Sequence, residues 1–243
     1  MTTAQKVCLI VGAGDGTGSA LARQFAKAGY SVCVTRRTPD ANTALVNQIQ
    51  ERGGRAQAFV LDARREDQVI ELFNKVEFEV GAIEVVIFNV GGNVRFPLLE
   101  MTAEKYFKTW EMCALAGFLV GREAARTMLP RKRGTILFTG ATASLRGGVG
   151  FSAFAGGKAA LRALAQSMAR EFCPQGLHVA HVVVDGVIDS ERVRVAQPDR
   201  VAALGPQGLI NPDSIAKEYL WLHEQTPDAW TFELDLRPGV EKW

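Results

Sequence analysis

Short apolar segments alternate with longer amphipathic segments along almost the whole chain. Several of the short segments, such as residues 7–11, 85–88 and 179–184, are continuously apolar. Continuous apolarity is typical of strands in a parallel sheet that helices cover on both faces. The pattern predicts strands at residues 6–11, 31–36, 55–61, 85–89, 135–139, 178–184 and 231–236, and helices at residues 19–28, 42–52, 66–80, 103–128, 151–172 and 211–224.

This alternation predicts one doubly wound α/β domain over residues 1–243, with a parallel sheet and helices on both faces. A length of 243 residues suits one large α/β domain better than two small ones. Residues 186–209 lack a periodic pattern, and we expect them to form an irregular, mobile lid over a ligand site.

A glycine-rich run, GAGDGTG, occupies residues 12–18 between the first predicted strand and the first predicted helix. Glycines allow a tight turn and a close approach of the backbone to a pyrophosphate, whose charge then faces the free N–H groups at the helix start. The context predicts a Rossmann-type dinucleotide site. Its expected contacts are Gly12, Gly14, Asp15, Gly16, Thr17 and Gly18.

The spacing of Gly12, Gly16 and Gly18 resembles that of the short-chain dehydrogenase/reductase family, and the resemblance extends over nearly the whole chain. It implies that Asp62, with Ala63, contacts adenine, and that Asn89 and Gly91 stand in the family's Asn-Asn-Ala-Gly segment. It also implies that Lys158 is the family's active-site lysine. Residues 185–190 resemble the segment that holds the nicotinamide carboxamide, with contacts from Gly186, Ile188 and Ser190.

The second predicted strand ends at Arg36 and Arg37, where an NAD site usually places an acid for the ribose hydroxyls. Guanidinium groups pair with a 2′-phosphate, which a carboxylate would repel. We therefore predict NADP(H) as the favoured cofactor, with NAD(H) possible. Asp15 is evidence against NADP(H), because some NADP-using relatives carry a basic residue at that position. The alternative for Arg36 and Arg37 is that they are only the solvated end of a strand.

The same resemblance indicates that catalytic groups are missing. Aligned on the retained Lys158, the family's tyrosine falls on Phe154 and its serine on Ala141. Aligned on Gly117 in the long helix, the family's asparagine falls on Ala114. Phenylalanine cannot donate a proton, and alanine cannot hold a developing oxyanion. The loss of general acid catalysis costs about 10²–10⁴ in rate, and that of one oxyanion donor about 10²–10³.

Other groups could substitute for these residues. A small alignment shift brings Thr142 or Ser144 to the serine position, and Lys158 could donate a proton itself or through water. The glycines after Ser144 make it and Thr142 more typical of turn residues. His181 lies on the opposite side of its predicted strand from the neighbouring valines and is interpreted as a core residue rather than a catalytic one.

Two functional hypotheses follow from these residues. In the first, the chain is an NADP(H)-dependent oxidoreductase with a non-standard proton-delivery site. In the second, it is a catalytically inactive NADP(H)-binding sensor or partner subunit. A scaffold that binds no nucleotide is disfavoured by the intact glycine run at residues 12–18.

Net charge and composition limit which partners the chain can be expected to bind. The net charge of +2 is too small for a nucleic-acid surface, and the basic run at residues 131–133 is read as a solvated loop. The first apolar run is too short for a signal peptide or a membrane span. The cysteines, which show no metal-ligand spacing, are expected to be reduced, so we predict a cytoplasmic location and no metal. The four cysteines are Cys8, Cys33, Cys113 and Cys173.

The resemblance implies a homodimer or homotetramer paired through the helices at 103–128 and 151–172.

Overall fold

Seven parallel strands form one sheet in the order β3-β2-β1-β4-β5-β6-β9 in the computed structural model, which describes residues 5–240. The strand order reverses between β1 and β4, and ligands of such sheets bind beside the carboxyl ends of the strands at this switch point. The strands are β1 (Lys6–Val11), β2 (Ser31–Arg36), β3 (Arg55–Val60), β4 (Ala82–Phe88), β5 (Gly134–Thr139), β6 (Leu177–Val184) and β9 (Glu233–Leu236).

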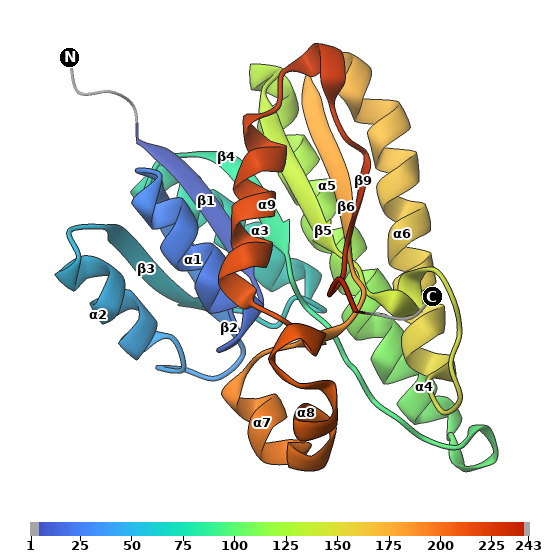
Figure 1. The fold of residues 1–243 in the computed structure, drawn as a ribbon. Coiled ribbons are helices and arrows are strands. Elements are labelled where there is room, and N and C mark those ends of the chain that lie inside the picture. The colour runs from blue at the N-terminus through green and yellow to red at the C-terminus, as the bar shows by residue number, and fades with distance from the viewer. Residues whose placement is uncertain (1–4, 241–243) are drawn as a thin grey trace.

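Helices cover both faces of this sheet (Figure 1). Helices α1, α2 and α9 contribute to the hydrophobic cluster on one face, and α3, α5 and α6 to the cluster on the other. The predicted doubly wound α/β fold is therefore confirmed. The helices are α1 (Thr17–Lys27), α2 (Thr43–Glu51), α3 (Glu66–Glu79), α5 (Ala116–Met128), α6 (Ser152–Phe172) and α9 (Pro212–Glu224).

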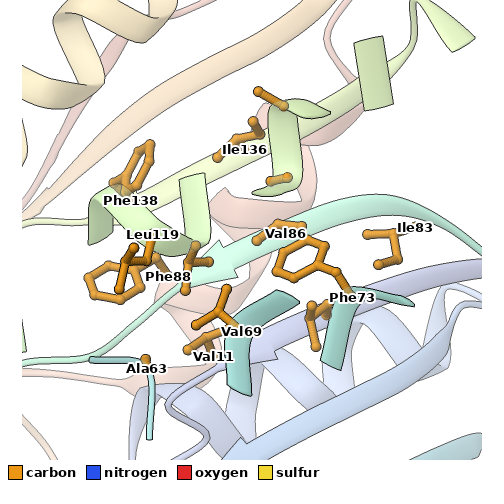
Figure 2. Close-up of a cluster of buried hydrophobic side chains, with 14 of the residues drawn as sticks. Val11, Ala63, Val69, Phe73, Ile83, Val86, Phe88, Leu119, Ile136 and Phe138 are labelled. Carbon is orange, nitrogen blue, oxygen red and sulfur yellow. The ribbon is translucent and has the colours of Figure 1, made fainter. Parts of the chain in front are cut away.

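The continuously apolar strands explain this layering. Successive residues of β4 point to opposite faces, so Val86 and Phe88 pack with α3 and α5, whereas Val85 and Ile87 pack on the α1 and α9 side. Figure 2 shows the first of these clusters, in which Phe88 and Leu119 lie together and Val69 points at the same core. Helices and apolar side chains cover both faces of the sheet, so the edge at the carboxyl ends of the strands is where a polar ligand can bind.

The predicted helix at 103–128 is interrupted. Helix α4 (Ala103–Trp110) is followed by a π-helical turn (Glu111–Leu115) and then by α5. Such π insertions occur frequently at functional sites. Ala114 lies inside this turn and is buried. Helix α1 also begins two residues earlier than predicted, so Thr17 and Gly18 belong to its first turn.

The prediction of an irregular segment at 186–209 is wrong. Strands β7 (Val187–Ile188) and β8 (Leu209–Ile210) pair with each other, and helices α7 (Glu191–Ala196) and α8 (Pro198–Leu204) lie between them. The helix pair projects beyond the carboxyl ends of the sheet, at the bottom of Figure 1. Each short helix begins at a residue that favours a helix start: the Ser190 side chain caps α7, and Pro198 is the first residue of α8.

Candidate active site and dinucleotide pocket

The glycine run forms a tight connection between β1 and α1. A Cβ atom on Gly18 would lie 2.5 Å from the Cα of Ala13, so only glycine permits this approach of helix to strand. The Asn89 side chain donates to the carbonyl oxygen of Gly12 over 2.9 Å. The loops that follow β1 and β4 are thereby tied together at the switch point of the sheet.

The first turn of α1 contains a polar atom that fits a bound anion. Thr17 is 7% exposed, and its Oγ1 has no hydrogen-bond partner among residues 5–240. A buried hydroxyl without a partner costs free energy unless a ligand satisfies it. Because Thr17 lies at a helix N-terminus directly after the glycine run, its hydroxyl is placed to donate a hydrogen bond to an oxygen of a dinucleotide diphosphate.

A pocket of about 220 Å³ lies at the carboxyl ends of β1, β2 and β4. The structure brings together here eight residues that the sequence predicted as cofactor contacts: Gly12, Gly14, Arg36, Arg37, Asp62, Ala63, Asn89 and Gly91. Sequence reasoning missed the remaining lining residues, which are Val11, Thr35, Leu61, Arg64, Val90, Met112 and Ala116. Most of the missed residues are apolar and carried no motif.

Arg36 and Arg37, at the end of β2, differ in how many hydrogen bonds their side chains form within the protein. The Arg36 side chain donates to the carbonyl oxygens of Ala13 (2.9 Å) and Ala41 (3.2 Å) and pairs with Asp15 at 2.7 Å. Arg37 is exposed and forms no hydrogen bond or ion pair with any residue from 5 to 240. Arg36 therefore stiffens the glycine loop, while the Arg37 guanidinium is available to a ligand phosphate.

Asp62 has a partner that the sequence reading did not foresee. Arg64 binds both of its carboxylate oxygens, at 2.9 Å from Nε and 2.6 Å from the terminal nitrogen. This pairing holds the pKa of Asp62 below its usual range. The two-residue spacing of the acid and the arginine was the available signal. Arg64 adds a third guanidinium group to the wall of the pocket, after those of Arg36 and Arg37.

The segment predicted to hold the carboxamide lies across from the glycine run. A Cβ atom on Gly16 would be 3.5 Å from the Cβ of Ser190 and 3.9 Å from a methyl of Ile188. Gly186 packs beside Pro238 and Ile210 at the root of this segment. The remaining predicted contacts are not among the residues that line the 220 Å³ pocket; they are Asp15, Gly16, Thr17, Gly18, Lys158, Gly186, Ile188 and Ser190.

Lys158 projects from α6 to the carboxyl ends of two strands. Its Nζ donates to the carbonyl oxygens of Thr139 (2.7 Å) and Val90 (3.1 Å), and the residue is 3% exposed. Burial lowers the pKa of this amine. An ammonium has three donors, so one remains for a ribose hydroxyl or a substrate.

The positions of the missing catalytic groups meet at an apolar surface. Phe154 packs with Cys113 and Ala143, and Ala141 borders this small cluster. The Lys158 amine lies 5.9 Å from the centre of the Phe154 ring. Ala114, next to Cys113 in the π-helical turn, is also buried. None of Ala141, Phe154 and Ala114 can exchange a proton with a substrate.

Two hydroxyls of the turn after β5 remain close to these positions. The Thr142 hydroxyl donates to the carboxylate of Asp185. The Ser144 Oγ accepts from the backbone N–H of Ala141 at 3.1 Å, and Ser144 is 5% exposed. Both residues stabilise the turn, as the glycine-rich sequence around them indicates.

Within residues 5–240, no group of three potential ligand side chains is arranged to hold a metal ion. None of the helices in the described part of the chain is long and apolar enough to span a membrane.

Comparisons with known proteins agree with this site. A family model described as short chain dehydrogenase matches residues 6–200. A solved short-chain dehydrogenase from Rhodopseudomonas palustris is 44% identical, with a TM-score of 0.83 over 96% of this chain and 98% of that one. A metagenomic short-chain oxidoreductase in complex with NADP is 26% identical, with a TM-score of 0.81 over 98% of this chain and 99% of that one.

Among curated proteins, the uncharacterized oxidoreductase YuxG of Bacillus subtilis is 30% identical over 220 residues, which are 88% of this chain and 31% of YuxG. The chain thus spans less than a third of that relative. Together with the doubly wound sheet and the glycine run, these matches show that the chain belongs to the short-chain dehydrogenase family.

Proposed function

We propose that this chain binds NADP(H) and transfers hydride between it and a small-molecule substrate, with a proton route that differs from the family's usual one. The observation that carries the cofactor assignment is Arg37, which is exposed, lines the 220 Å³ pocket and has no hydrogen bond or ion pair to any of residues 5–240. Its guanidinium can form charge-assisted, bidentate bonds to a 2′-phosphate. The NADP bound to the metagenomic relative supports the same cofactor.

Different residues would bind the different parts of the dinucleotide. Thr17 and the glycine loop would hold the diphosphate, Arg37 the 2′-phosphate, and Arg64 with Asp62 the adenine side. The free donor of Lys158 would orient the nicotinamide ribose. A bound dinucleotide would supply hydride chemistry, and the apolar cluster of Phe154, Cys113 and Ala143 would exclude water beside Lys158.

Calorimetric titration with NADPH and NADH tests the cofactor assignment. We expect NADPH to bind more tightly, and Arg37→Ala to weaken NADPH binding about 10–100-fold while leaving NADH binding unchanged, because a hydrogen bond to a charged group contributes about 1.5–3 kcal/mol. Arg36→Ala is the matched control: it loosens the glycine loop, so it weakens both cofactors together. Equal affinity of the wild type for NADH and NADPH would refute the assignment.

A second candidate function is a catalytically inactive NADP(H)-binding sensor or partner subunit. The apolar surface formed by Ala141, Phe154 and the π-helical turn favours it. The variant Phe154→Tyr/Ala141→Ser discriminates between the candidates, with NADPH oxidation by ethyl acetoacetate as the assay. A rise of about 10²–10⁴ in rate indicates a working pocket that lacks the usual acid. No rise with intact NADPH binding favours the sensor.

We further propose that the chain is a homodimer or homotetramer in the cytoplasm, paired through α4–α5 and α6. Aromatic side chains stand exposed on this surface: Phe107 is 56%, Phe118 42% and Tyr106 41% exposed. Light scattering of the wild type and of Phe107→Asp tests this pairing. The variant is expected to be monomeric at concentrations where the wild type is not.

A further inference from the structure

A second and larger pocket lies at the amino ends of the strands, opposite the dinucleotide pocket. Its volume is about 760 Å³, and small-molecule sites typically have volumes of roughly 300–1,000 Å³. It is bounded by residues at the starts of β1, β5 and β6 and by the segment that joins α9 to β9, at the top of Figure 1. Within residues 5–240, the two pockets share no lining residue. The larger pocket is lined by Lys6, Tyr30, Glu84, Lys132, Arg133, Gly134, Thr135, Cys173, Pro174, Gly176, His178, His223, Gln225, Pro227 and Trp230.

One wall of this pocket carries an indole ring that is held in place. The Trp230 ring stacks on the His178 imidazole, with ring centres 5.0 Å apart and an angle of 1° between the planes. The indole N–H donates to the carbonyl oxygen of Gln225 at 3.2 Å, and His178 Nε2 donates to the carbonyl oxygen of Thr231 at 2.9 Å. Trp230 is half-buried, so part of its ring surface is left to the pocket. An aromatic surface fixed in this way can pack against a planar ring with little further loss of side-chain freedom.

A second pair of rings lines the same pocket. The Tyr30 hydroxyl lies 2.6 Å from His223 Nε2, and the two rings meet edge to face with centres 5.5 Å apart. The other nitrogen of His223, Nδ1, lies 2.8 Å from the hydroxyl of Thr135 on β5. Burial lowers the pKa of His223 to about 4 and also lowers that of His178. At neutral pH both imidazoles are therefore uncharged and contribute flat ring surface to the pocket.

The charged groups of the pocket are mainly basic. Lys6, Lys132 and Arg133 line it, whereas the described residues supply only one acid. This acid is Glu84, whose carboxylate is 6% exposed and has both oxygens bound by Arg133. Lys6 and Lys132 are exposed, and their side chains form no hydrogen bond or ion pair with any residue from 5 to 240. Two ammonium groups are therefore available to an anionic group of a ligand.

We propose that this pocket is a second ligand site, which binds a small planar molecule that carries an aromatic ring and a carboxylate. The ring packs against Trp230 and the neighbouring imidazole surfaces, and the carboxylate pairs with Lys6 and Lys132. An uncharged ring would leave the ammonium groups unused, and a non-aromatic acid would leave the indole surface unused. Occupancy of this site does not require NADP(H), because the two pockets lie at opposite ends of the sheet.

NMR of the wild-type protein locates the ligand directly, with 1-naphthoate as the probe and ¹⁵N-labelled histidine. The chain has three histidines, of which His178 and His223 line the pocket. The third, His181, is an internal control: it lies further along β6, is 0% exposed, and has its Nδ1 3.0 Å from Glu233 on β9. Each signal is assigned by its loss in the corresponding His→Gln variant. We expect 1-naphthoate to shift the ring resonances of His178 and His223 and to leave those of His181 in place. Unchanged resonances of His178 and His223 at millimolar 1-naphthoate would overturn the proposal.

Calorimetric titration with 1-naphthoate tests the ring and the charge separately. Trp230→Leu is expected to weaken binding about 3–10-fold through loss of the aromatic contact. Its matched control is Trp221→Leu, which changes an exposed tryptophan of α9 outside the pocket and leaves the affinity unchanged. The double variant Lys6→Gln/Lys132→Gln is also expected to weaken binding about 3–10-fold, whereas Lys108→Gln on α4 does not. The double variant alters only exposed side chains, so it remains informative if Trp230→Leu does not fold.

Three further titrations complete the test. Neutral 1-naphthalenemethanol and non-aromatic cyclohexanecarboxylate are each expected to bind at least about tenfold more weakly than 1-naphthoate. Arg37→Ala, in the dinucleotide pocket, is expected to leave 1-naphthoate binding unchanged. Weakened binding in Arg37→Ala would place 1-naphthoate in the dinucleotide pocket and overturn the proposal. Full affinity in both Trp230→Leu and the double lysine variant, or equal affinity for the uncharged or the non-aromatic compound, would do the same.

Discussion

The buried His181 predicts a specific loss of stability in mild acid. Its pKa is lowered by burial to about 4 in the folded protein, against 6.5 for a solvated histidine. Between these values the unfolded chain binds a proton that the folded chain does not, so protonation favours unfolding. The stability present above pH 6.5 is therefore lost as the pH falls toward 4. At pH 5 the loss from this residue amounts to about 2 kcal/mol.

The assay is urea unfolding followed by tryptophan fluorescence at pH 7 and pH 5, for the wild type and His181→Gln. The glutamine side chain can still donate to Glu233 but does not titrate. We expect the wild type to lose about 2 kcal/mol more than the variant between the two pH values. His223, whose pKa is also lowered to about 4, is present in both proteins and cancels in the comparison.

Glu233 does not interfere in this pH window. The hydrogen bonds from Arg162 lower its pKa below 4.5, so its contribution is lost only at lower pH. Equal losses in the wild type and His181→Gln would show that His181 is not held neutral by burial, and would refute the reasoning. A variant that is less stable at pH 7 does not obscure the result, because the measured quantity is the difference between the two pH values.

Three further substitutions test other contacts. Gly18→Val places a Cβ 2.5 Å from the Cα of Ala13, so it should separate α1 from β1 and weaken NADPH binding at least about tenfold by calorimetry. Tyr219→Phe removes a 2.7 Å bond to Thr139 inside the core and should lower the free energy of unfolding by about 1–2 kcal/mol, with the urea slope unchanged. Arg133→Ala leaves the carboxylate of Glu84, 6% exposed, without its cation, and should cost about 1–3 kcal/mol in the same assay.

Exposed ion pairs supply the control for the last substitution. Lys108 and Glu104 pair at 2.6 Å with side chains that are 61% and 74% exposed. Solvent screens such a pair, so Lys108→Ala should leave the urea midpoint unchanged. If Arg133→Ala behaves in the same way, burial of Glu84 does not make its partner necessary.

The sequence by itself determined the layered fold and the place of the dinucleotide pocket. Continuous apolarity in strands such as β4 indicates helices on both faces of the sheet, and a glycine run between β1 and α1 permits the tight turn and close helix–strand approach of a dinucleotide site. These are local signals, because each depends on residues that are near one another in the chain. For this reason the strands and most helices could be read with errors of only a few residues.

The pairing of Arg64 with Asp62 and the two short helices α7 and α8 also had local signals, a two-residue spacing and the helix starts at Ser190 and Pro198. These signals were overlooked because the segments around them lack apolar periodicity. The π-helical turn at Glu111–Leu115 is different, since its residues include no glycine or proline that would mark an interruption of the predicted helix.

Only the tertiary structure decided which polar groups meet at the site. His181 on β6 and Glu233 on β9 lie 3.0 Å apart, and nothing in their sequence spacing links them. Likewise, Arg36 and Arg37 are neighbours in sequence, yet Arg36 is bound to loop carbonyls and Arg37 is bonded to no residue of the described range 5–240. Hydrogen bonding depends on distance and direction between groups remote in the chain, and these are set when the strands take their places in the sheet.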